Sequence, residues 1–82
     1  MLKEIGRVLA RYREEMEVKF PKEWSQTQVA EKMGKKRLGF ISRIEIGKDQ
    51  PSLKYIGKLL KLYEKSEADF FHDVAGEYLD RS

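Results

Sequence analysis

The sequence predicts an all-α fold, a bundle of five helices, and three observations support that prediction. Apolar residues recur at three- and four-residue steps in successive segments, as they do on one face of a helix. No segment shows the strict apolar–polar alternation of a half-buried strand. Serine, glycine and proline separate the periodic segments where helices commonly begin and end. With 82 residues the chain can bury one small core, so we expect residues 1–82 to form a single domain.

The first helix is expected over residues 2–16. Its apolar positions are Leu2, Ile5, Val8, Leu9, Tyr12 and Met16. Residues 17–23 break this pattern, and Pro21 disfavours a helical conformation at Phe20, directly before it. The segment is therefore either a loop or an extension of the first helix followed by a turn. In both cases we expect Phe20 and Trp24 to fold back onto the core.

The second helix begins at a strong capping signal. Ser25 is a favourable N-cap, and Gln28 three residues later completes the pattern of a capping box. The positions expected on its buried face are Val29, Ala30 and Met33. Gly34 can adopt the left-handed conformation that commonly ends a helix, so we expect the second helix to end there.

A short turn over residues 35–37 leads into a third helix, expected over residues 38–46. Ile41 and Ile44 form its buried face, and Gly47 ends it. Two short helices joined by a turn that contains glycine form a helix-turn-helix, whose second helix can enter the major groove of DNA. The centre of the chain therefore predicts a DNA-binding motif.

Two further helices complete the expected bundle. Ser52, directly after Pro51, caps the fourth helix, and Ser66 caps the fifth. The apolar stripe of the fourth helix is Leu53, Ile56, Leu59, Leu60 and Tyr63. Glu67 and Asp69 lie in the first turn of the fifth helix, where the helix dipole favours acidic side chains. The fifth helix continues the apolar pattern with Phe70, Phe71, Val74, Tyr78 and Leu79.

Charge is distributed unevenly along the chain, which has a formal net charge of +3. Residues 35–48 carry five basic side chains and one acidic side chain, whereas residues 66–82 carry five acidic side chains and one basic side chain. A basic middle and an acidic tail suggest a surface that faces a polyanion and an opposite end turned away from it. The alternative is ordinary solvated charge on the helix surfaces.

Composition excludes several other functions. The chain has no cysteine, so disulfides and thiolate metal sites are excluded, and its single histidine, His72, has no second histidine to share a metal. No G-x-G-x-x-G motif, P-loop or spacing typical of a catalytic triad is present, so we expect no enzyme, no metal and no cofactor. No run of about 18 apolar residues and no signal-peptide stretch occurs, so we expect a soluble, cytoplasmic protein.

Four groups of residues occur in an order typical of one protein family. They are Ile5-Gly6 followed by Leu9 and Arg13; Ser25-Gln26 with Val29-Ala30; Ile41 to Glu45 followed by Gly47-Lys48 and Pro51-Ser52-Leu53; and Leu59 to Tyr63 followed by Ser66 and Phe70-Phe71. With these residues the chain resembles the Xre-type, phage-repressor-like (lambda-repressor-like) helix-turn-helix family over nearly its whole length. Two spacings are longer than usual in the family, from Arg13 to Ser25 and, by a single residue, from Gly34 to Ile41.

The resemblance implies that the third helix reads DNA bases. Arg43 follows the buried Ile41 by two positions, so it should point away from the core, and its guanidinium can donate two hydrogen bonds to O6 and N7 of guanine. The alternatives are a solvated arginine or a phosphate contact. Leu38 could contact a thymine methyl group, and Gly39 either lets the backbone approach DNA or relieves packing. Ser42 is assigned to the same DNA-binding set.

Phosphate contacts are expected around the reading helix. Ser25 and Gln26 begin the second helix, where free backbone N–H groups and the helix dipole favour a phosphate, although capping alone would also explain them. The other expected backbone contacts are Lys35, Lys36, Arg37, Lys48, Gln50 and Ser52. Basic side chains there give affinity that falls with salt, and solubility is their alternative role. The resemblance also implies an internal ion pair between Arg13 and Glu45, which fixes the first helix against the third.

We expect a homodimer. The apolar residues of the fifth helix, Phe70, Phe71, Val74, Tyr78 and Leu79, exceed what one small core needs and can form a two-fold dimer surface. Alternatively, they simply close the core. A dimer would place two reading helices on half-sites about one DNA turn apart.

These expectations predict a sequence-specific transcriptional regulator that binds double-stranded DNA. Repression fits better than activation, because the chain has no room for an effector domain and blocking polymerase needs only occupancy. Two alternatives stay open: an antitoxin-like regulator that binds operator DNA and a partner toxin, or a helix-turn-helix whose third-helix face binds protein. The basic residues 35–48 favour DNA, whereas Leu38 and Gly39 are weak candidates for base recognition.

Overall fold

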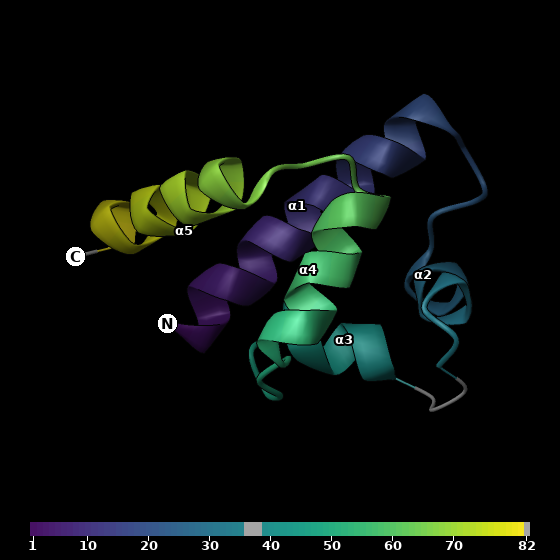
Figure 1. Ribbon diagram of the computed structural model, residues 1–82, viewed down its shortest axis with the longest axis horizontal. Coiled ribbons are helices and arrows are strands. Elements are labelled where there is room, and N and C mark those ends of the chain that lie inside the picture. The colour runs from purple at the N-terminus through teal and green to yellow at the C-terminus, as the bar shows by residue number, and fades with distance from the viewer. Residues whose placement is uncertain (36–38, 82) are drawn as a thin grey trace.

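The computed structural model describes residues 1–35 and 39–81, and these residues form five α-helices and no strand (Figure 1). The helices are α1 (Leu2–Lys19), α2 (Gln26–Lys32), α3 (Phe40–Glu45), α4 (Leu53–Leu62) and α5 (Glu67–Arg81). The predicted all-α fold is confirmed for this part of the chain. Lys36, Arg37 and Leu38, which the sequence assigns to the turn and to the start of the reading helix, lie outside the described residues.

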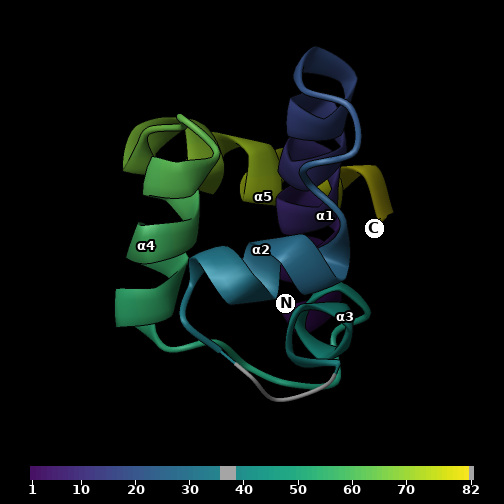
Figure 2. The same cartoon turned by 90° about the vertical axis from the view of Figure 1, so that its right-hand side faces the viewer.

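The helix α1 is the centre of the arrangement. It contacts both α3 and α5, while α2 contacts α3, and α4 contacts α5. Figures 1 and 2 show α3 near the N-terminal end of α1, with α2 beside it. In Figure 1, α5 extends away from the α2–α3 pair, so the helix-turn-helix and the C-terminal helix occupy opposite sides of the molecule.

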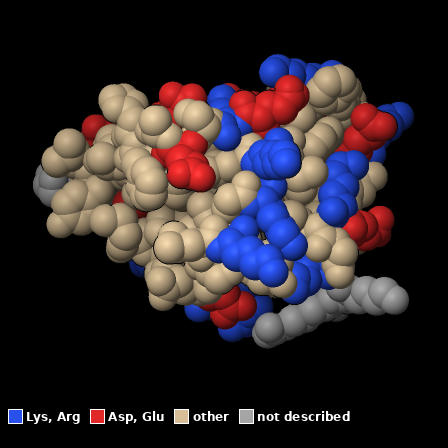
Figure 3. Space-filling view, in the orientation of Figure 1, with Lys and Arg blue, Asp and Glu red and all other residues tan. Residues whose placement is uncertain are grey.

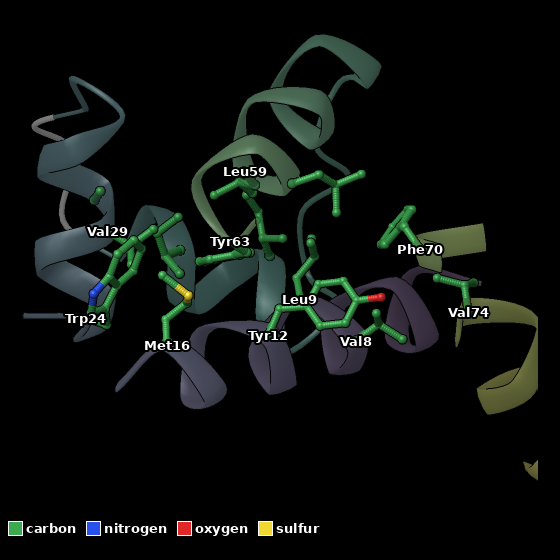
Figure 4. Packing of buried hydrophobic residues seen from close by; sticks show 14 residues of the cluster. Val8, Leu9, Tyr12, Met16, Trp24, Val29, Leu59, Tyr63, Phe70 and Val74 are labelled. Carbon is green, nitrogen blue, oxygen red and sulfur yellow. The ribbon is translucent and has the colours of Figure 1, made fainter. Parts of the chain in front are cut away.

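The hydrophobic core runs along α1 (Figure 4). Its buried side chains are Val8, Leu9, Tyr12, Met16, Trp24, Val29, Ala30, Ile41, Ile44, Leu59, Leu60, Tyr63, Phe70 and Val74. Phe70 and Val74 lie at one end of this stripe, and Trp24 and Val29 lie at the other. Every helix contributes side chains to the core, so the burial of apolar surface, the dominant favourable term in folding, holds all five helices together.

The predicted N-caps of α2, α4 and α5 are confirmed. Ser25 Oγ accepts a hydrogen bond from the backbone N–H of Gln28 at 3.1 Å, and Gln28 Oε1 accepts one from the backbone N–H of Ser25 at 3.0 Å. This reciprocal pair is a complete capping box. Ser52 and Ser66 each accept a hydrogen bond from the backbone N–H three residues further on. Each cap satisfies an N–H group that has no partner inside its own helix.

The link between α1 and α2 is organised by one carboxylate. α1 extends to Lys19, so the structure shows the extended first helix and not the longer loop. Glu17 then accepts hydrogen bonds from the backbone N–H groups of Lys22 at 2.8 Å and Trp24 at 2.7 Å. These bonds turn the chain so that Trp24 returns to the core, as predicted. The prediction for Phe20 is wrong, because this side chain stays outside the turn and is 46% exposed.

The helix α3 is shorter than predicted. It begins at Phe40, whereas the sequence predicts a helix over residues 38–46 with Gly39 inside it. Gly39 has a φ of +78°, a left-handed conformation, and therefore lies before the helix as its N-cap. A Cβ at this position would meet no atom of the described residues within 4 Å, so packing against them does not require the glycine, whereas the backbone conformation does. An L-residue with a side chain would cost roughly 1–2 kcal/mol in this conformation.

A second glycine sets the distance between α1 and α3. A Cβ at Gly6 would lie 2.5 Å from the backbone carbonyl oxygens of both Ile44 and Glu45. A larger residue therefore fits only if α3 moves away from α1. This close approach brings the C-terminal end of α3 within reach of the charged side chains of α1.

Candidate nucleic-acid interface

A buried ion pair joins α1 to α3. Arg13 Nε donates to Glu45 Oε2 at 2.7 Å, and Arg13 Nη2 donates to Glu45 Oε1 at 3.2 Å. Only 16% of the Arg13 side chain and 6% of the Glu45 side chain are exposed. Arg13 Nη1 also donates to the backbone carbonyl oxygen of Trp24 at 3.2 Å. The hydrogen bond to Glu45 raises the pKa of Arg13, so the guanidinium keeps its charge in this setting.

The side chain of Gln26 bonds to the same carboxylate. Its Nε2 donates to Glu45 Oε1 at 2.8 Å, which connects the first turn of α2 to the last turn of α3. Glu45 therefore holds α1, α2 and α3 in one arrangement, with no ligand required. The amide nitrogen of Gln26 has a second N–H, which is still able to donate to a phosphate. The predicted contact between Gln26 and a phosphate is therefore compatible with this bond and stays a prediction.

The exposed side of α3 carries a second arginine–carboxylate pair. Arg43 Nε donates to Asp49 Oδ2 at 2.8 Å, and Arg43 Nη2 donates to Asp49 Oδ1 at 3.1 Å. The two side chains are 43% and 33% exposed, and the hydrogen bond to Asp49 raises the pKa of Arg43. Sequence reasoning assigned Arg43 to DNA but missed Asp49. The two residues are separated by six positions, and only the left-handed turn at Gly47 brings them together.

An aromatic and cationic cluster lies beside α3. The rings of Phe40 and Tyr55 meet edge to face, with centroids 5.8 Å apart. The ammonium group of Lys35 lies 4.2 Å from the centroid of the Tyr55 ring and 5.6 Å from that of Phe40, and it also contacts the Tyr55 hydroxyl. This hydrogen bond from Lys35 lowers the pKa of Tyr55. The cluster was missed by sequence reasoning, although Lys54 and Lys58 on either side of Tyr55 mark α4 as a basic surface.

The remaining predicted contacts lie near this cluster. Gln50 and Ser52 line a hollow of about 410 Å³ with Phe40 and Tyr55, between α3 and α4. Lys48 is exposed in the turn after α3. Figure 3 shows Lys and Arg side chains gathered over the part of the molecule that holds α4 and α2, whereas few of them lie over the α5 end. The basic side chains seen in this view therefore lie over α2 and α4 and away from the α5 end.

The predicted dimer surface on α5 divides into two sets. Phe70 and Val74 are 3% and 7% exposed and belong to the core, so the alternative that the apolar residues of α5 close the core describes these two. Phe71, Tyr78 and Leu79 are 62%, 51% and 68% exposed. The three exposed residues line an open apolar groove of about 700 Å³, together with Ile5, Leu53 and Ile56. Leu53 was predicted on the buried stripe of α4, but it is 81% exposed, since the groove leaves its position uncovered.

Among the described residues, no group of three or more His, Cys, Asp or Glu side chains is placed to hold a metal ion, and His72 lies on the exposed surface of α5. No helix in the described part of the chain is long and apolar enough to cross a membrane.

Comparison with known proteins agrees with this geometry. A family model described as Helix-turn-helix matches residues 9–70, which is more than half of the chain. The chain therefore belongs to the helix-turn-helix family of DNA-binding regulatory domains, as the resemblance in the sequence suggested. No curated protein and no solved structure matches the chain.

Proposed function

We propose that this protein is a sequence-specific transcriptional regulator that binds double-stranded DNA with α3 in the major groove. The observation that carries the proposal is the division of α3 into two faces. Ile41 and Ile44 are buried against α1 and the core, while Ser42 and Arg43 remain partly exposed. A recognition helix needs this division, because side chains on its outer face must reach base edges while its inner face is held by the core.

The phosphate contacts of the proposed complex surround α3. Lys35 and Lys48 lie just before and just after it, and Gln50 and Ser52 follow at the start of α4. The further phosphate contacts predicted from the sequence are Ser25, Gln26, Lys36 and Arg37. Lys54, Tyr55 and Lys58 extend the same surface along α4. Contacts of this kind supply affinity and orientation but no choice of sequence.

Repression is the proposed mode of regulation. A repressor needs only to occupy a site that polymerase or an activator requires. The described residues form the five helices and the short links between them. They form no additional lobe that could recruit polymerase. Occupancy of an operator is therefore the simplest regulatory output for this domain.

The proposed regulator acts as a homodimer. Phe71 and Tyr78 expose aromatic surface next to an apolar groove, and aromatic residues are enriched at protein interfaces. A two-fold dimer would present two copies of α3 to half-sites about one DNA turn apart. Phe71→Asp should shift sedimentation from dimer to monomer, whereas Val18→Asp, at an 81% exposed apolar position outside the groove, should not. Equal behaviour of the two variants would exclude the groove as the dimer contact.

The same groove favours a second candidate function, an antitoxin-like regulator. In that case a partner toxin, and not a second copy, would cover Phe71 and its neighbours while α3 still binds an operator. Salt separates this mode from DNA binding, because a mainly apolar protein contact weakens little with salt and a phosphate-based contact weakens steeply.

Selection of binders from a random pool of double-stranded DNA tests the proposal. At about 150 mM salt, where non-specific binding is reduced, we expect enrichment of an inverted repeat. Arg43→Glu should abolish the enrichment, whereas Arg11→Glu, which makes the same charge change at an exposed residue of α1, should preserve it. Absence of enrichment with folded protein would contradict sequence-specific binding, and a single unrepeated site would contradict the dimer.

A further inference from the structure

We infer that Asp49 is a positioning residue for base recognition: it holds one edge of the Arg43 guanidinium so that the opposite edge can meet guanine. This inference rests on the proposed function and adds to it the residue that sets specificity at one base. Asp49 itself need not touch DNA in this role.

The geometry of the pair assigns the two edges. Asp49 accepts from Nε and Nη2 of Arg43, at 2.8 Å and 3.1 Å, so it occupies the side-on edge of the guanidinium. Guanidinium carries five N–H donors in a rigid plane. The end-on edge, made by Nη1–H and the second Nη2–H, is left with two parallel donors. Two parallel donors are what O6 and N7 of guanine accept.

The backbone fixes this arrangement before DNA binds. The carbonyl oxygen of Arg43 accepts hydrogen bonds from the backbone N–H groups of Lys48 at 2.9 Å and Asp49 at 3.2 Å. The turn that allows both bonds depends on Gly47, whose φ is +81°. Asp49 is thus tied to Arg43 through the main chain as well as through the side chain. The side-chain pair and the backbone bonds both lie in the turn after α3.

The position of Asp49 is unusual for a carboxylate. Residues 35–50 carry two acidic side chains, Glu45 and Asp49, among five basic ones. Glu45 is buried against Arg13, so Asp49 is the acidic side chain on the exposed side of this segment. A carboxylate here repels DNA phosphates and lowers general affinity. An exposed ion pair also adds little to stability, so neither general affinity nor folding accounts for Asp49.

Restraint of Arg43 accounts for it. An unrestrained arginine is long and flexible, and it reaches phosphates of any sequence as easily as a base edge. A guanidinium held on one side loses that freedom in advance and favours the partner that its free edge fits. Asp49 therefore lowers the affinity for DNA of any sequence and increases the preference of Arg43 for guanine.

The test measures discrimination, which is the loss of binding affinity when a guanine in the DNA is replaced, and not affinity alone. The inverted repeat obtained by selection is bound in its natural form and with each guanine replaced in turn by 7-deazaguanine, which lacks the N7 acceptor. Wild-type protein should lose about tenfold in affinity at the guanine read by Arg43, the magnitude typical of a bidentate base contact. Asp49→Ala should reduce that loss to less than about threefold and leave binding to unrelated DNA unchanged or tighter.

Three further variants complete the test. Asp80→Ala removes the same charge from the exposed surface of α5 and should keep the wild-type discrimination. Asp49→Asn keeps one acceptor oxygen and should restore part of the discrimination. Adding Asp49→Ala to Arg43→Ala should change nothing further at that guanine, since a positioning role for Asp49 requires the Arg43 guanidinium.

The outcomes separate this inference from the proposed function. If selection from random DNA enriches no sequence, both the proposed DNA-binding function and the positioning role of Asp49 are overturned. An enriched repeat whose discrimination is equal or greater in Asp49→Ala overturns the positioning role alone, because Asp49 would then be neutral or would compete with DNA for Arg43. Discrimination that also falls in Asp80→Ala would overturn it, since the effect would be one of net charge.

Discussion

Two arginine–carboxylate pairs use the same chemistry on different faces of α3. The pair of Arg13 with Glu45 and the pair of Arg43 with Asp49 are both bidentate, with shortest N–O distances of 2.7 Å and 2.8 Å. They differ in burial. The Glu45 side chain is 6% exposed, whereas the Asp49 side chain is 33% exposed. A buried pair is costly to break, while an exposed pair contributes little to stability. The same interaction therefore holds the fold on one face and is available to a ligand on the other.

Breaking the buried pair should give the largest effect. Glu45→Ala leaves the Arg13 guanidinium with only the carbonyl of Trp24 and leaves the amide of Gln26 without its partner. We expect a loss of about 3 kcal/mol in the free energy of unfolding, at the low end for buried pairs because Arg13 is partly exposed. Urea unfolding measures it. Glu31→Ala, at an exposed position of α2, is the control and should change stability by less than about 0.5 kcal/mol.

The close approach that permits the buried pair can be tested separately. Gly6→Ala places a Cβ against the carbonyl oxygens of Ile44 and Glu45, so α3 must shift. We expect a loss of roughly 2 kcal/mol, as for overpacked cores. Gly57→Ala in α4, where a Cβ meets no atom of the described residues within 4 Å, should instead stabilise the protein by about 0.5–1 kcal/mol. Thermal unfolding of both variants decides the point, and a tolerated alanine at Gly6 would show that α3 can move freely.

The exposed pair should respond in the opposite way. Arg43→Ala is expected to change the free energy of unfolding by less than about 0.5 kcal/mol, but to weaken binding to the selected DNA by about 1–3 kcal/mol. Arg11→Ala is the matched control, because Arg11 also forms an exposed pair, with Asp73 at 3.9 Å, and lies outside the predicted interface. Fluorescence anisotropy gives the affinities. Equal weakening on all DNA sequences would make Arg43 a phosphate contact.

The smallest effect should come from a tyrosine beside the buried pair. Burial, and then the negative charge of Glu45, raise the pKa of Tyr63, whose ordinary value is 10.0. The hydroxyl stays neutral in the folded protein at a pH where the unfolded chain has lost the proton. Stability from this group is therefore constant below about pH 10 and falls above it.

Tyr63→Phe should reduce that alkaline loss. Because Tyr63 Oη makes no hydrogen bond with the described residues, removing it should also raise stability near neutral pH, by up to about 1 kcal/mol. Tyr12→Phe is the contrasting variant, since its hydroxyl is bonded to Asp73 and its removal should destabilise. Urea unfolding at about pH 7 and pH 11 measures both effects. An unchanged pH profile in Tyr63→Phe would show that this hydroxyl does not titrate with unfolding.

Local signals in the sequence predicted most of the fold. The caps at Ser25, Ser52 and Ser66 depend on residues three positions apart, and such short-range patterns can be read directly. The start of α3 could not be predicted in the same way. Gly39 is compatible with a weak helix position and with a left-handed cap, and only the backbone path chooses between them.

The site was predicted less completely, for a physical reason. Asp49 reaches Arg43 because a left-handed turn reverses the chain, and Tyr55 of α4 contacts Lys35, which follows α2 and is 20 positions away in the sequence. Neither contact follows from spacing along one helix. The α5 surface was also only partly predicted, because Phe70 and Phe71 are adjacent and equally apolar. Their helical phase relative to α1 decides that one is buried and the other exposed.

The position of Trp24 has a practical consequence. It is the one tryptophan of the chain, it is 9% exposed, and its ring centroid lies 6.1 Å from that of Tyr63. Its own backbone is held by Glu17 and Arg13, so it lies where α1, α2 and α4 meet. Its emission should therefore be blue-shifted in the folded protein and move to longer wavelength when these helices separate. The chain thus carries a built-in fluorophore beside its buried ion pair, and each stability variant can be followed without a label.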